Sequence, residues 1–205
     1  DSILTIALDM GKDTNCVFFL MESSNKLKSK NRHQAMSLLE ESEKISKELN
    51  FIRGVALSKL YMSDINRTKG ENELALKNCL YAISLMDSIK YTGYLPSAYN
   101  DLAQINYEIG RKEEAFENNK IAYVIAKKNM NMHQMGRSLT NIGVRYADLG
   151  EYDKALSYFK ECELIALNTK SDYGYALSLI NLGSCYFHLN EYKTAFNNYN
   201  KALVI

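Results

Sequence analysis

One short stretch of the sequence groups side chains that can bind a soft metal ion. Residues 130–135 read Met-Asn-Met-His-Gln-Met, and thioether and imidazole groups together can ligate Cu(I). The stretch has no Cys or carboxylate to complete such a site. Methionine also fills irregular gaps between helices. We favour that interpretation, so the sequence predicts no metal site.

The remaining reactive side chains do not form a catalytic pattern. No nucleophile elbow, P-loop or GxGxxG motif is present. The cysteines form no CxxC pair, and we interpret them as small buried residues; they are Cys16, Cys79, Cys162 and Cys185. The histidines have no metal-ligand partner at helical spacing; they are His33, His133 and His188. We expect this segment to be no enzyme and to need no cofactor, whereas a kinase domain outside it is left open.

Two side-chain amides offer chemistry of another kind, that of recognition. Asn141 and Asn181 stand forty positions apart, and each precedes an apolar residue and a Gly. An amide carries both a donor and an acceptor, so it can pair with extended peptide backbone much as a strand edge does. The alternative is that these residues bridge neighbouring helices or meet only water.

In the first helices a stripe outside the apolar face recurs at the spacing i, i+3 and i+7, and it starts at Asp101, Asn141 and Asn181 in the last three repeats. We take the stripe and its flanks as candidate ligand contacts. They are Asn100, Asp101, Gln104, Tyr107, Arg137, Thr140, Asn141, Asn181, Ser184 and His188.

The elements that carry these residues recur every forty positions. Alanine occupies one position of the frame throughout, at Ala35, Ala75, Ala115, Ala155 and Ala195. A residue that tolerates positive φ recurs where a helix should end, at Gly70, Gly110, Gly150 and Asn190. Apolar residues between these markers are spaced i, i+3, i+4 and i+7, which indicates one buried helix face. The sequence therefore predicts repeated helix–turn–helix units.

We expect first helices near 14–29, 52–69, 94–109, 134–149 and 173–189. Second helices are expected near 32–49, 72–89, 112–129, 152–169 and 192–205. The predicted organisation is a single solenoid over 1–205 with about five repeats, at 14–50, 51–92, 93–132, 133–172 and 173–205. Residues 1–13 are expected to form a leading helix or a linker. The chain ends within an apolar helix, KALVI, so we expect it to be cut from a longer protein.

The repeat resembles the tetratricopeptide repeat (TPR). The resemblance rests on the stretches LTNIGVRYADLGEYDKALSYFKEC and LINLGSCYFHLNEYKTAFNNYNKA. It departs from the family at the Trp position, in lacking the terminal Pro, and in a period of forty rather than about 34 residues. It implies an all-α, right-handed superhelix of antiparallel helix pairs, with first helices on the concave side. In long-period members an Asn before Leu-Gly holds the ligand backbone, and Asn141 and Asn181 match that position.

Charge and hydropathy limit the classes of partner. Lys and Arg number 25 and Asp and Glu 24, so the chain has no electrostatic reason to bind nucleic acid. The longest uncharged run, 173–190, carries polar residues at helical spacing, and we interpret it as an amphipathic helix rather than a membrane span. We expect a protein or peptide partner, and a homodimer is left open.

The resemblance implies a sensory or regulatory part of a bacterial signal-transduction protein, either a sensor histidine kinase or a transcription regulator. The opening residues are similar to extracytoplasmic TPR sensors, which implies a periplasmic part of a membrane-anchored protein. A passive scaffold or adaptor for complex assembly is the alternative. Neither hypothesis names the ligand.

Overall fold

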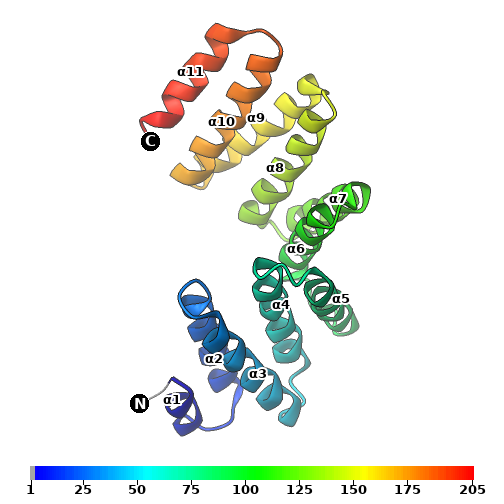
Figure 1. Ribbon diagram of the computed structural model, residues 1–205, viewed down its shortest axis with the longest axis vertical. Coiled ribbons are helices and arrows are strands. Elements are labelled where there is room, and N and C mark those ends of the chain that lie inside the picture. The colour runs from blue at the N-terminus through cyan, green and yellow to red at the C-terminus, as the bar shows by residue number, and fades with distance from the viewer. Residues whose placement is uncertain (1–2) are drawn as a thin grey trace. The chain divides into compact units, whose positions relative to one another are not determined.

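A computed structural model describes residues 3–205, and within that range the chain forms eleven α-helices and no strand (Figure 1). The helices are α1 (Ile3–Asp9), α2 (Thr14–Leu27), α3 (Arg32–Glu48), α4 (Ile52–Thr68), α5 (Asn72–Ser88), α6 (Leu95–Glu108), α7 (Lys112–Lys128), α8 (Met132–Asp148), α9 (Tyr152–Asn168), α10 (Asp172–His188) and α11 (Tyr192–Leu203). The all-α fold class predicted from the sequence is confirmed. The expected leading helix corresponds to α1, although positions 1 and 2 of that prediction lie outside the described residues.

The helices divide into two compact units, Asp1–Arg111 and Lys112–Ile205. In each unit a first helix packs against its second helix, as α4 does on α5 and α8 on α9. The second helix then packs against the next first helix, as α3 does on α4 and α9 on α10. The boundary falls between α6 and α7, at the expected turn of the third repeat. The five-repeat division and the superhelical handedness stay predictions.

The turns within and between repeats share one hydrogen-bonded geometry. At the end of α8, Gly150 has φ 74° and donates to the carbonyl of Ala147 over 2.9 Å. At the end of α9, Lys170 has φ 52° and donates to the carbonyl of Leu167 over 3.2 Å. In both, the next residue donates to the carbonyl five residues before it, which closes a Schellman motif.

Five residues other than Gly hold this left-handed conformation within the described chain: Asn50, Lys90, Met130, Lys170 and Asn190. The sequence predicts the left-handed conformation at Asn190 and at the turns that contain Gly. The sequence does not predict this conformation at Lys90 or Lys170, because Lys is not a preferred residue in the left-handed region.

Small residues at fixed positions let the helices approach closely. The recurrent alanines are all buried: Ala35, Ala75, Ala115, Ala155 and Ala195. A Cβ added to Gly143 on α8 would lie 2.6 Å from the ring of Phe159 on α9. The same relationship recurs between Gly183 and Tyr199, at 2.7 Å. The Gly of each Leu-Gly or Ile-Gly pair therefore makes room for the aromatic ring of the second helix.

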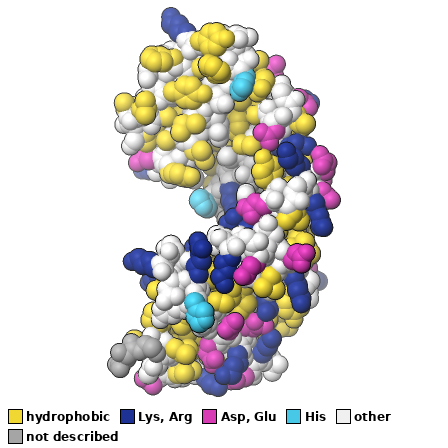
Figure 2. Space-filling view, viewed as in Figure 1, with side chains coloured by type: hydrophobic (Ala, Val, Ile, Leu, Met, Phe, Trp, Pro, Cys, Tyr) yellow, Lys and Arg dark blue, Asp and Glu magenta, His cyan; other side chains and the backbone are white. Residues whose placement is uncertain are grey.

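The uncharged run at 173–190 falls on helix α10, which is less amphipathic than expected from the sequence because its exposed side is also apolar. Leu179 and Leu182 are buried on one side, whereas Ile180 and Phe187 are about half exposed on the other. Figure 2 shows hydrophobic side chains at the surface of this part of the chain. Among the described residues, no helix has the length and apolar character to cross a bilayer.

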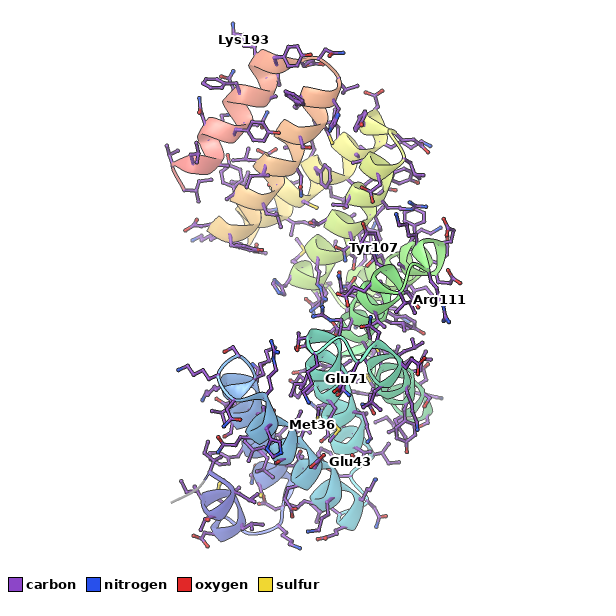
Figure 3. All side chains as sticks on the ribbon, in the orientation of Figure 1. Met36, Glu43, Glu71, Tyr107, Arg111 and Lys193 are labelled. Carbon is purple, nitrogen blue, oxygen red and sulfur yellow. The ribbon has the colours of Figure 1, made fainter. Side chains whose placement is uncertain are left out.

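One carboxylate of the first unit is buried at a helix–helix contact. Glu43 on α3, labelled in Figure 3, is 8% exposed. Its oxygens lie 2.6 Å from Lys47 Nζ and 2.7 Å from Lys59 Nζ, so it links α3 to α4. Burial raises the pKa of Glu43, but the hydrogen bonds and charges of the two lysines outweigh it and hold the pKa below its usual value. The ion pairs therefore stabilise the packing of α3 on α4.

Candidate functional site

Asn141 links two helices of the second unit. Its side-chain amide on α8 donates a hydrogen bond to Oδ1 of Asn119 on α7 over 3.1 Å. Asn119 is 7% exposed, whereas Asn141 is partly buried. This contact is the helix bridge considered as the alternative in the sequence analysis. It also holds the amide of Asn141 in one orientation at the surface.

Asn181 occupies the equivalent position on α10 but lacks the equivalent partner. The residue forty positions after Asn119 is Phe159, which has no polar group. Asn181 is partly buried, and its side chain makes no hydrogen bond within residues 3–205. Its amide is therefore not needed for helix packing, and both its donor and its acceptor can serve a ligand.

A pocket of about 380 Å³ opens on the second unit between the N-terminal halves of α8 and α10, with α9 at its base. Three of the predicted contact residues line it: Arg137, Thr140 and Asn141. Apolar side chains supply much of the remaining wall: Met132, Ile165, Ala166 and Leu177. The structure therefore brings part of the predicted stripe together around a concave apolar surface. Its volume is in the range of small-molecule and side-chain pockets, about 300–1,000 Å³.

Hydrogen bonds fix the wall of this pocket beside α9. The hydroxyl of Thr140 donates to the carbonyl of Gly136 over 2.9 Å, and Thr140 Oγ1 lies 3.4 Å from Cys162 Sγ. Burial raises the pKa of Cys162 to about 11, although the hydrogen bond with Thr140 lowers it in part. The thiol is therefore protonated near neutral pH and packs rather than acting as a nucleophile.

None of the predicted contacts of α10 lines this pocket, and this includes Asn181. Ser184 is exposed and does not line it. His188, at the end of α10, stacks on Tyr152 at the start of α9, with ring centroids 4.9 Å apart and planes 2° apart. His188 therefore belongs to an aromatic contact near the turns.

The predicted residues of the first unit stand in a different setting. Gln104 on α6 donates to Glu108 over 2.9 Å, and Glu108 in turn pairs with Arg67 on α4. Arg67 also pairs with Asp64, which accepts from Lys28 at the end of α2. Burial raises the pKa of Asp64, but Lys28 and Arg67 together lower it below its usual value. These charges join three successive first helices by ion pairs.

Three further predicted contacts lie on α6. Asn100 is fully buried, so its amide is not available at the surface. Burial is the main reason that the pKa of the Cys79 thiol rises to about 12, and the nearby charge of Asp101 adds to the rise. Tyr107, labelled in Figure 3, is 43% exposed. Of this group, only Asp101 and Tyr107 reach the surface.

Sequence reasoning missed the two glycines of the pocket, Gly136 on α8 and Gly174 on α10. A Gly inside a predicted helix was the available signal, because it weakens a helix unless packing or a ligand requires it. Within the described chain no group of His, Cys, Asp or Glu is placed to hold a metal ion. Met132 and Met135 pack against the core cluster of Leu139, Cys162 and Ile165.

The fold is that of an α-solenoid built from TPR-type helix pairs. Residues 134–205 match the family model described as "Tetratricopeptide repeat". The resemblance stated from the sequence is therefore confirmed. No curated protein sequence matches the chain.

Solved structures share the fold at low identity. BtubC (BKLC) from P. vanneervenii is 17% identical, with a TM-score of 0.85 over 97% of this chain and 85% of that chain. A Signal Transduction ATPase with Numerous Domains (STAND) protein with a tetratricopeptide repeat sensor, from Pyrococcus horikoshii, is 18% identical, with a TM-score of 0.81 over 98% of this chain and 30% of that chain. A Rap protein complexed with Competence and Sporulation Factor is 15% identical, with a TM-score of 0.73 over 91% of this chain and 52% of that chain.

Proposed function

We propose that the chain is a protein- or peptide-binding module and that its second unit holds the ligand on the face formed by α8 and α10, called here the first-helix face. The observation that carries the proposal is the pocket of about 380 Å³, which combines an apolar wall with Asn141, Thr140 and Arg137. Concave apolar sites with a few placed polar groups are the usual form of ligand sites.

The two asparagines suit an extended segment that crosses this face from α8 to α10. Asn141 is oriented by Asn119, so little side-chain entropy is lost when it binds. The side-chain carbonyl and NH2 group of Asn181 make no other hydrogen bond within residues 3–205. Paired amides can replace the hydrogen bonds that an extended backbone would otherwise make with water.

We further propose a sensory or regulatory role in a bacterial signal-transduction protein. Support comes from two proteins of the same fold, one described as having a TPR sensor and one solved in complex with the Competence and Sporulation Factor. The chain spans 30% and 52% of those two proteins, so effector activity would reside in other parts of such a protein. A passive scaffold would bind its partner without any change in an attached activity.

A synthetic peptide array tests the binding proposal directly. Residues 1–205 are incubated with immobilised peptides of about ten residues, and retained protein is quantified for the wild type, Asn141→Ala and Asn181→Ala. We expect a subset of peptides to bind the wild type and to bind both variants at least about tenfold more weakly, since each variant loses hydrogen bonds to the peptide backbone. Unchanged binding by both folded variants would show that the two asparagines do not contact the ligand.

A further inference from the structure

Gly136 is a helical glycine that the protein itself does not require. It lies inside α8, outside the left-handed region, so its backbone conformation suits any residue. A Cβ added there would meet only Ile165 Cγ2, at an ordinary contact distance of 3.5 Å. Gly143, seven residues further along the same helix, differs because an added Cβ would clash with Phe159. Glycine costs a helix about 0.5–1 kcal/mol relative to alanine, and at Gly136 no internal packing offsets that cost.

The space left by Gly136 belongs to the pocket. Gly174 lines the opposite wall on α10, but an added Cβ there would lie 3.0 Å from Ser171 Oγ and 3.3 Å from Ala166 Cβ, so close packing accounts for this glycine. Of the two glycines, only Gly136 leaves space for a side chain, and that space faces a cavity whose base is formed by Ile165 and Ala166. Any larger residue at position 136 would occupy part of that cavity, because its side chain would extend beyond Cβ into the open space.

The charges of the pocket select against one class of occupant. Its described lining includes Arg137 and His133 but no Asp or Glu. A Lys or Arg side chain entering the pocket would lose water without gaining an opposite charge from the wall, and such burial is costly. A large uncharged apolar side chain would instead contact Met132, Ile165 and Leu177 and remove apolar surface from water.

We propose, on the basis of the peptide-binding function above, that this pocket is a specificity pocket for one large apolar side chain of the bound segment. Gly136 keeps the pocket open for that side chain, while Asn141 beside it holds the adjacent backbone. The ligand class is therefore an extended protein segment with a Phe-, Leu- or Met-like residue at one fixed position and no Lys or Arg at that position.

A positional peptide library tests this inference. Each position of a binding peptide from the array is replaced in turn by Phe, Leu, Met, Ala, Glu and Lys, and affinity is measured by fluorescence anisotropy. For the wild type we expect one position at which Phe, Leu or Met binds at least about tenfold more tightly than Lys. Gly136→Leu should abolish that preference, because its side chain fills the pocket.

Two controls separate filling of the pocket from damage to the fold. Ser157→Leu adds the same bulk at an exposed position of α9 that does not line the pocket, and it should keep the preference. Gly136→Ala adds one methyl group to a helix that accepts it, so it should shift the preference toward smaller side chains at equal or higher thermal stability. This second variant keeps the inference testable should Gly136→Leu fail to fold.

The outcomes distinguish this inference from the function on which it rests. Peptide binding without any positional apolar preference would overturn the specificity pocket and leave peptide binding in place. Retention of the preference by folded Gly136→Leu would overturn it as well. A wild-type chain that binds no peptide in the array would overturn the proposed function and the specificity pocket together.

Discussion

The side-chain amide of Asn141 lies 3.1 Å from Oδ1 of Asn119 and ties α8 to α7. Forty residues later Asn181 has no such partner, because Phe159 stands where Asn119 would be. Two asparagines at one repeat position therefore have different structural roles. In our proposal both contact the ligand, but only Asn141 also supports the fold.

Asn141→Ala should lower the free energy of unfolding by about 1–2 kcal/mol, because it leaves the buried amide of Asn119 without its partner. Asn181→Ala should change it by less than about 0.5 kcal/mol, as surface substitutions usually do. Urea denaturation followed by circular dichroism measures both values. Equal losses in the two variants would contradict the difference in their roles.

Gly143→Ala should destabilise the protein by about 1–3 kcal/mol, because the new methyl group would overlap the buried ring of Phe159. Gly136→Ala is the matched control on the same helix and should raise stability by up to about 1 kcal/mol. Thermal unfolding of the two variants provides the comparison. The account of α8 packing would be wrong if Gly143→Ala were as stable as the wild type.

Lys170→Gly should stabilise the protein by about 1 kcal/mol, because residue 170 has φ 52° and a side chain is strained in that conformation. Gly150→Ala should have the opposite effect at the equivalent turn within the repeat, where φ is 74°. The midpoint of thermal unfolding should therefore rise for the first variant and fall for the second. A fall for Lys170→Gly would argue against the Schellman turn at the end of α9.

Glu43 should make stability depend on pH. Its folded-state pKa lies below the usual value of 4.5, so its contribution is fully present above pH 4.5 and is lost as the pH falls through the folded-state pKa. Glu43→Gln should cost about 2 kcal/mol at pH 7 and flatten this part of the acid-unfolding profile. Glu22→Gln, which breaks an exposed pair with Lys26, should leave the profile nearly unchanged. An unaltered acid profile in Glu43→Gln would contradict the stabilising role of the pair.

The helices follow closely from the sequence because local signals define their ends. Each expected helix begins and ends within two residues of the observed one, since apolar spacing and the turns at Gly70, Gly110, Gly150 and Asn190 set the frame. The turns at Lys90 and Lys170 carry no such signal. There the left-handed conformation accompanies the Schellman hydrogen bonds that end α5 and α9.

The site follows from the sequence only in part. The periodic pattern correctly selects Asn141 and Thr140, which line the pocket. It also selects predicted contacts that do not line it: Asn181, Ser184 and His188. The position of the neighbouring helix decides whether a side chain faces a pocket, and the spacing of residues in the sequence does not give that position. Gly136 on α8 is an example, because its proposed role depends on how far it lies from Ile165 on α9.

The most direct test of peptide binding at the first-helix face is a map of backbone amide shifts during titration with a peptide from the array. Isotope-labelled residues 1–205 would be followed by nuclear magnetic resonance as peptide is added. We predict that the largest shifts fall on α8 and α10, around Gly136, Asn141 and Gly174, and that they weaken in Asn141→Ala. Shifts concentrated on α2–α5, or on the exposed faces of α9 and α11, would contradict the account.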